Sequence, residues 1–210
     1  MSSFIKHFSE KWLIYLISLV LIFTFWLAVI DEVVAVKPGE KIGIFLGTYG
    51  VYQTVAEEIE KPTGVEEIGI FDANINEDYY FVIFAAYASN NDFDFSIVNE
   101  KQFRESDIQY YQPLNRELIT AYFGEREYFT LNDNIYGIKI YDGETGEGIL
   151  TDYVSYSSDG AAEDYYLFFH KNSIHIGGLN NSADDKAIQL IQNLINKYTE
   201  GVIENGNNQN

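Results

Sequence analysis

The sequence contains no cysteine, and this absence excludes several kinds of protein. Without cysteine the chain forms no disulfide, so it is not one of the small secreted scaffolds that depend on disulfides for stability. It also lacks the residue through which bacterial lipoproteins are attached to lipid. The chain therefore needs a sizeable hydrophobic core, and any attachment to a membrane must use another kind of anchor.

Basic residues are also scarce. The chain has 13 Lys and Arg against 32 Asp and Glu, which gives a formal net charge of −19 at pH 7. Nearly all of this charge follows the first 31 residues. Nucleic acid and anionic surfaces are poor partners for such a chain, because like charges repel. The acidic residues form either a solvated surface or sites for divalent cations, and composition leaves both open.

Motifs that identify catalytic sites are missing. The sequence has no nucleophile elbow, phosphate-binding P-loop, dinucleotide-binding glycine pattern or HExxH. His170 and His175 could hold a metal only with Asp164 or Asp184, and their spacing matches no known ligand pattern. The loop Asp142–Glu147 lacks the spacing of an EF-hand and favours a hairpin turn. We therefore predict no catalytic residue, no metal and no cofactor.

One long apolar run, Trp12–Ile30, contains no charged residue, Pro or Gly. At about 1.5 Å of rise per residue, a helix of this length crosses a hydrocarbon core of about 30 Å. Lys6 and Lys11 precede the run, whereas Asp31 and Glu32 follow it. Because basic residues stay on the cytoplasmic side, we predict a single-pass cell-membrane protein with a cytoplasmic N-terminus and an extracellular C-terminal domain.

A cleaved signal peptide is the alternative, since Val33 and Ala35 stand where small residues precede a cleavage site. The run is longer than the apolar part of most signal peptides, which favours an uncleaved anchor. The predicted division of the chain is a cytoplasmic N-terminus (1–11), a transmembrane helix (12–30), a juxtamembrane linker (31–41), an extracytoplasmic domain (42–198) and a disordered tail (199–210).

The domain opens with a strand, a helix and a strand. Lys41–Gly47 is apolar and β-branched, Val51–Lys61 has apolar residues at helical spacing, and Glu67–Phe71 is again typical of a strand. This order predicts a parallel pair and an α/β fold, a single three-layer domain with a mixed sheet after the N-terminal transmembrane helix. Further predictions are a helix at Glu77–Ala88, a strand at Phe93–Val98, an extended segment at Ile108–Pro113, a helix at Leu114–Phe123, a hairpin of Tyr136–Tyr141 with Ile149–Tyr156, a hairpin of Tyr165–His170 with Ser173–Ile176, and a last helix at Lys186–Lys197.

The predicted sheet also indicates where a ligand would bind. In open α/β sheets, ligands lie outside the carboxyl ends of the parallel strands. Hydroxyl, aromatic and amide side chains at these ends suit a neutral polar ligand such as a sugar or a peptide, although ordinary connecting loops would look the same. The predicted ligand-binding residues are Thr48, Tyr49, Gly50 and Tyr52 after the first strand, Asp72 and Asn74 after the second, and Asn99 and Glu100 after the third.

The order KIGIFLGTYGVYQTVAEEIEK, EEIGIF, DFDFSIVNEKQF and YQPLN resembles the first lobe of the extracellular solute-binding proteins of bacterial ABC importers. YGIKIYD and DYYLFFHKNSIHIG, followed by a closing helix, are similar to the return strands and last helices of that family. The resemblance implies a non-catalytic binding domain linked to transport or sensing. The segment between Pro113 and Tyr136 is too short for a second lobe, so the resemblance is to a reduced, single-lobe relative.

Two other functions stay open. An envelope interaction module would dock onto another protein through surface tyrosines, because aromatic side chains dominate interfaces. A cell-wall hydrolase would need a pair of carboxylates, and no pair can be singled out among so many acidic residues. The predicted partner is therefore a small solute or a membrane or envelope protein.

Overall fold

A single helix, α1 (Ser3–Val34), contains the whole apolar run. The computed structural model describes residues 3–34, 36–51, 55–158 and 163–207, and the chain divides into two units, Met1–Lys37 and Pro38–Asn210. Large apolar side chains of α1 are exposed, among them Trp12 (53%), Phe25 (66%) and Trp26 (57%). The first unit therefore presents an apolar surface on a regular helix.

Among the residues that the structure describes, no helix is both long and apolar enough to cross a membrane. The transmembrane helix at Trp12–Ile30 is not confirmed by the structure and stays a prediction from the sequence.

The second unit is an α/β domain built on a mixed seven-strand sheet, as predicted. The strand order is β3-β1-β4-β9-β6-β5, with the short β7 paired to β6. β1 pairs in parallel with β3 and β4, whereas the other pairs of this sheet are antiparallel. Its strands are β1 (Lys41–Thr48), β3 (Glu67–Asn74), β4 (Phe95–Asn99), β5 (Tyr128–Leu131), β6 (Asn134–Asp142), β7 (Glu147–Gly148) and β9 (Tyr165–Phe169), and a separate pair joins β2 (Gly50–Val51) to β8 (Val154–Ser155).

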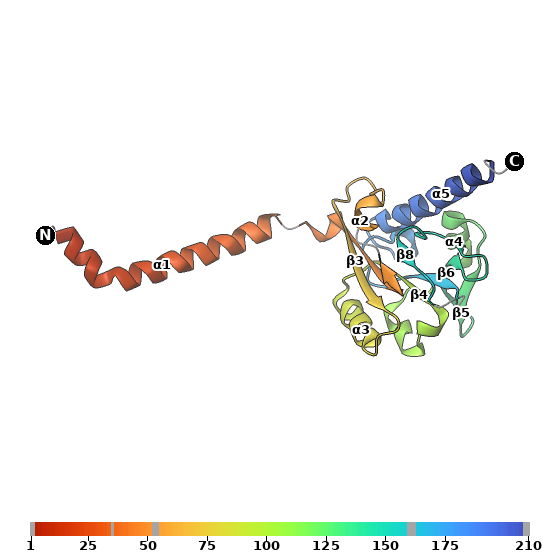
Figure 1. Cartoon of the computed structure of the whole chain (residues 1–210), viewed down its shortest axis with the longest axis horizontal. Coiled ribbons are helices and arrows are strands. Elements are labelled where there is room, and N and C mark those ends of the chain that lie inside the picture. The colour runs from red at the N-terminus through yellow and green to blue at the C-terminus, as the bar shows by residue number, and fades with distance from the viewer. Residues whose placement is uncertain (1–2, 35, 52–54, 159–162, 208–210) are drawn as a thin grey trace. The chain divides into compact units, whose positions relative to one another are not determined.

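Helices cover both faces of this sheet (Figure 1). Along β1, Ile42 and Ile44 face one apolar cluster, which includes Ile188 of α5. Phe45 faces the other cluster, which includes Phe84 of α3. The alternation along β1 therefore directs its side chains to two apolar clusters, one on each face of the sheet. The helices of the domain are α2 (Val55–Glu58), α3 (Tyr80–Asn90), α4 (Arg116–Phe123) and α5 (Lys186–Asn207), with 3₁₀ turns η1 (Pro38–Glu40), η2 (Glu100–Gln102), η3 (Glu105–Tyr110) and η4 (Gly177–Leu179).

The helix predicted at Val51–Lys61 is wrong at both ends. Val51 belongs to β2, where it pairs with Val154, and the helix α2 ends at Glu58. Acidic residues at 57, 58 and 60 oppose the negative end of the helix dipole, which disfavours a longer helix. Two apolar positions of the predicted stripe, Val55 and Ile59, are buried nonetheless.

The hairpin turn predicted at Asp142–Glu147 is confirmed, because β6 and β7 pair antiparallel across it. Neither predicted hairpin, however, has the second strand that the sequence indicated. Ile149–Tyr156 contributes only the two residues of β8 to a ladder, and these pair with β2 rather than β6. Ser173–Ile176 forms no strand, because the buried Ser173 hydroxyl bonds to Asp94 and the N–H of His175 donates to that hydroxyl.

Three further segments differ from the predictions. Ile108–Pro113 begins inside the 3₁₀ turn η3 instead of being extended throughout. The strand β5 was not predicted, although it pairs with β6. The last helix continues past Lys197 to Asn207, so most of the tail predicted to be disordered is helical.

Candidate functional site

The carboxyl ends of β1, β3 and β4 lie side by side at one edge of the sheet. The register pairs Thr48 of β1 with Asn74 of β3. Because β9 runs antiparallel to β4, its first residue, Tyr165, pairs with the last residue of β4, Asn99. The start of β9 therefore joins the same edge. We call Thr48, Asn74, Asn99, Glu163 and Tyr165 the strand-end cluster.

The chain that follows β1 is held by hydrogen bonds. Asn74 donates from Nδ2 to the carbonyl of Tyr49 (3.1 Å), and the N–H of Tyr49 donates to the carbonyl of Ser155 (3.0 Å). The buried Thr48 hydroxyl donates to the carbonyl of Gly50 at 3.4 Å. Four of the predicted residues, Thr48, Tyr49, Gly50 and Asn74, are therefore brought together at this edge.

Asn99 is buried at the end of β4, and both ends of its amide are bonded. Its Oδ1 accepts from the N–H of Gln102 (2.9 Å) and caps η2, while its Nδ2 donates to Glu163. Lys101 forms an ion pair with the other carboxylate oxygen of Glu163. The Glu163 side chain is 9% exposed and that of Lys101 is 72% exposed. The hydrogen bond to Glu163 raises the pKa of Lys101.

Tyr165 carries the most unusual polar atom of the cluster. Its side chain is completely buried, and its hydroxyl has no hydrogen-bond partner among the residues that the structure describes. Its ring packs on those of Tyr156 and Tyr141, with centroids 4.7 Å and 6.0 Å away. Burial raises the pKa of this hydroxyl, the nearby Tyr49 raises it further, and the Asn99 amide opposes the rise. Buried polar groups nearly always have a partner, so this hydroxyl and the neighbouring Asn99 amide are the groups at this edge on which a ligand could form a new hydrogen bond.

Other predicted residues do not join the cluster. Asp72 is exposed within β3, because that strand continues to Asn74 instead of ending at Phe71. Glu100 is exposed in η2. Tyr52 lies outside the described residues.

Sequence reasoning missed Lys101, Glu163 and Tyr165. Glu163 and Tyr165 stand at the start of a strand whose neighbours in the sheet cannot be identified from the sequence. The pairing of β9 with β4 brings them beside Asn99, which lies more than 60 positions earlier in the chain. An aromatic strand start preceded by an acidic residue is too common a pattern to have identified them.

Both ring nitrogens of each histidine in the domain interact with other groups of the protein. His170 donates from Nε2 to the carbonyl of Ala88 (3.1 Å) and accepts at Nδ1 from the N–H of Asn172 (3.3 Å). Burial lowers the pKa of His170. His175 has Nδ1 2.7 Å from Asp184 and Nε2 3.0 Å from the carbonyl of Pro38. Over the described part of the chain, no group of three or more His, Asp or Glu could hold a metal ion.

No protein family, curated protein or solved structure matches the chain. The resemblance to solute-binding proteins therefore rests on the sequence motifs alone and stays a prediction. The geometry of the strand-end cluster is the basis on which a function can be proposed.

Proposed function

We propose that the chain is a membrane-anchored, extracytoplasmic and non-catalytic binding domain that takes a small neutral polar solute at the strand-end cluster. The observation that carries the proposal is the buried hydroxyl of Tyr165, to which no described residue is in hydrogen-bonding geometry. Leaving a buried hydroxyl unbonded costs about 1–3 kcal/mol. A ligand oxygen or amide that reaches this atom recovers that cost.

The surroundings of Tyr165 support a neutral ligand. The charge of Glu163 is balanced by Lys101, and the Asn99 amide bonds to the same carboxylate. Asn74 and Tyr49 add amide, backbone and aromatic groups at the same edge. Such groups bond to the hydroxyls of a sugar or the amides of a short peptide without demanding a charge.

The anchor belongs to the same proposal. Trp12–Ile30 carries no charge, and the exposed side chains of α1 include Leu19, Leu21 and Phe25. An apolar surface of this kind is stable only against lipid or another apolar partner. With basic residues before the run and acidic residues after it, the domain lies outside the cell, in a role linked to transport or sensing.

The alternative of a docking module gains less support from the structure. The chain has 17 tyrosines, but among the described side chains only Tyr15 and Tyr79 are exposed. Most of the others pack inside the two apolar clusters. Surface tyrosines are therefore too few to make a broad aromatic docking surface.

Ligand binding is tested with the full chain in lipid nanodiscs. A thermal-shift screen of monosaccharides, short peptides and Ca²⁺ should raise the melting temperature for sugars or peptides by about 5 °C or more at 100-fold excess over Kd. Tyr165→Phe should remove this shift without unfolding the protein, because within residues 55–158 and 163–207 no group is in hydrogen-bonding geometry to the lost hydroxyl. Tyr79→Phe, at an exposed position, is the matched control and should keep the shift. A flat response across the screen would overturn the proposed function.

The anchor is tested separately in cells that express the full chain. The protein should remain with membranes after alkaline washing, and a membrane-impermeant amine reagent should label the exposed Lys171 from outside. Recovery in the wash, or labelling only after lysis, would contradict the proposed location while leaving the ligand site untouched.

A further inference from the structure

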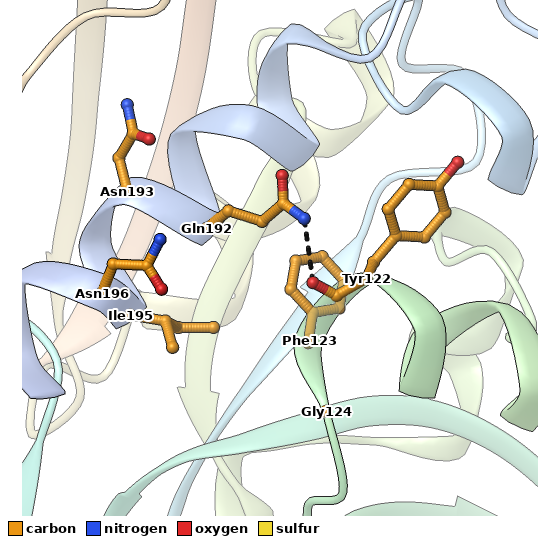
Figure 2. Close-up of a pocket in the computed structure, with 7 residues that line it drawn as sticks. All are labelled: Tyr122, Phe123, Gly124, Gln192, Asn193, Ile195 and Asn196. Carbon is orange, nitrogen blue, oxygen red and sulfur yellow. Dashed lines mark hydrogen bonds between the residues drawn. The ribbon is translucent and has the colours of Figure 1, made fainter.

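A pocket lies between α4 and α5, away from the strand-end cluster. Figure 2 shows that it is formed by the end of α4 and by one face of α5. Its volume is about 430 Å³, within the usual range of small-molecule sites. Its lining residues are Tyr122, Phe123 and Gly124 from the end of α4, and Gln192, Asn193, Ile195 and Asn196 from α5.

The lining is polar but carries no charge. Gln192 uses one amide hydrogen to bond the carbonyl of Tyr122 (2.9 Å), which ties α5 to α4 (Figure 2). Asn193 and Asn196 are three residues apart and therefore neighbours on the helix surface. Neither amide has a hydrogen-bond partner among the described residues. Although the chain has a net charge of −19, none of the lining residues is a carboxylate that would repel an anion.

A positive charge stands beside this pocket. Arg126 donates from Nε to the carbonyl of Phe123 (3.0 Å), a lining residue. Its terminal nitrogens form no hydrogen bond or ion pair with any residue that the structure describes. Burial lowers the pKa of Arg126, although the neighbouring Tyr128 and Tyr198 oppose this, and a guanidinium remains charged at neutral pH. A partly desolvated guanidinium with unused donors is a ready partner for an anion.

We propose that the pocket between α4 and α5 binds a small hydroxylated carboxylate, such as a sugar acid. The terminal nitrogens of Arg126 bond to the carboxylate, and the amides of Asn193 and Asn196 bond to hydroxyls. The Phe123 ring provides an apolar wall for the carbon skeleton. This site is independent of the strand-end cluster, none of whose residues lines it.

Calorimetric titration of the full chain, in nanodiscs of uncharged lipid at low salt, tests this site with D-glucuronate as the probe. We expect saturable binding of one glucuronate, and weaker binding of glucose, which lacks the carboxylate. Arg126→Gln should weaken glucuronate binding at least about tenfold, since it removes the charged donors. The double change Asn193→Ala with Asn196→Ala should weaken both sugars.

Controls separate this site from other effects. Arg116→Gln removes the same charge from an exposed position on α4 and should leave the affinity unchanged. Tyr165→Phe should also leave it unchanged. If Arg126→Gln fails to fold, the pair Asn193→Ala and Asn196→Ala still tests the site, because neither amide bonds to a residue in the described ranges. No saturable binding of glucuronate, full affinity in the asparagine pair, or loss of affinity in Tyr165→Phe would each overturn the proposal.

Discussion

The hydroxyl of Ser173 donates a hydrogen bond of 2.5 Å to Oδ1 of Asp94, although 79 positions separate the two residues. The other oxygen of Asp94 accepts from the N–H of Gly43 in β1 (2.8 Å). The backbone carbonyl of Asp94 accepts from the N–H of His170 (2.8 Å). One buried residue therefore joins β1, the start of β4 and the segment after β9, at the edge of the sheet opposite the strand-end cluster.

Asp94→Asn should destabilise the domain. The amide has one acceptor oxygen where the carboxylate has two, so either Gly43 or Ser173 loses its acceptor. An unsatisfied buried donor costs about 1–3 kcal/mol. Urea unfolding at pH 7 measures the loss, and Asp92→Asn at a partly exposed neighbouring position is the control. Equal stability of Asp94→Asn and the parent would contradict the role of this carboxylate.

The contribution of Asp94 should depend on pH. Burial raises the pKa of its carboxyl, while the hydrogen bonds from Ser173 and Gly43 and the nearby His175 oppose the rise. The folded state therefore holds this proton to a higher pH than the unfolded state, whose pKa is about 3.9. Stability from this group is greatest at low pH and falls as the pH rises through the folded pKa. The stability difference between the parent and Asp94→Asn should shrink from pH 4 to pH 7, and growth over that range would refute the assignment.

Gly43→Ala should be among the most damaging single changes in the domain. A Cβ at this position would lie 2.1 Å from the carbonyl oxygen of Asp92 and 2.6 Å from Cα of Phe93. Both contacts are with backbone, so no side chain can turn away, and we expect a loss of at least about 2–3 kcal/mol. Gly39→Ala is the matched control, because no atom lies within 4 Å of its Cβ position. Thermal unfolding of the two variants side by side measures the difference.

Lys139→Met should destabilise the domain near neutral pH. The Lys139 ammonium lies 2.9 Å from Glu127, 3.1 Å from Asp142 and 2.9 Å from Asp164, so its removal leaves three carboxylates without a cation. We expect a loss of about 1–2 kcal/mol, below that of a fully buried ion pair. Lys171→Met removes the same charge from an exposed site and should cost much less. Similar losses in both variants would indicate that net charge alone matters.

The loss of stability in Lys139→Met should depend on pH, because the pKa values of both Lys139 and Asp142 are shifted in the folded state. Burial lowers the pKa of Lys139, but its bonds to Asp164, Glu127 and Asp142 outweigh this and raise it above its usual value. Its stabilisation is therefore complete below about pH 10 and is lost as the pH rises through the folded pKa. The N–H of Thr145, followed by Lys139, lowers the pKa of Asp142, whose contribution is lost as the pH falls through that value. The loss of stability in Lys139→Met should therefore be largest at pH values between the folded pKa of Asp142 and that of Lys139, and smaller at pH 3.

Asn115→Ala should weaken α4. The Asn115 side chain caps this helix by accepting from the N–H groups of Glu117 (2.8 Å) and Leu118 (3.3 Å). Loss of such a cap costs about 1 kcal/mol. Asn115→Asp keeps the acceptor and should retain most of the stability. Because α4 also forms one side of the pocket, hydrogen exchange of its amides reports the change locally.

The strands that sequence reasoning identified correctly are those with dense apolar runs. Such runs occur in β1, β3, β4, β6 and β9. Because these strands are largely buried, their sequences are apolar enough to be recognised as strands. The parallel pairing of β1 and β3 followed from the helical segment between them. The short strands β2 and β8 could not be predicted from the sequence, because a strand of two residues has no periodic pattern. Their pairing depends on how the rest of the domain brings them together.

The candidate site was predicted in part for the same reason. Thr48, Asn74 and Asn99 are the last residues of strands that the sequence predicts, so the rule for carboxyl ends leads to the edge where they lie, and their binding of a ligand stays a prediction. Glu163 and Tyr165 reach that edge through an antiparallel strand late in the chain. The segment Ser173–Ile176 was misread because its apolar and polar alternation imitates a strand, while its polar groups bond to Asp94 instead of a ladder.

The position of β1 in the sheet has a consequence for synthesis of the chain. β1 is the first strand of the domain to be made, yet its Ile42, Ile44 and Leu46 pack in a cluster that includes Ile188 and Ile191 of the last helix. A nascent chain therefore carries an uncovered apolar face until α5 has emerged from the ribosome. During that interval the growing chain is open to aggregation and is a natural client for chaperones.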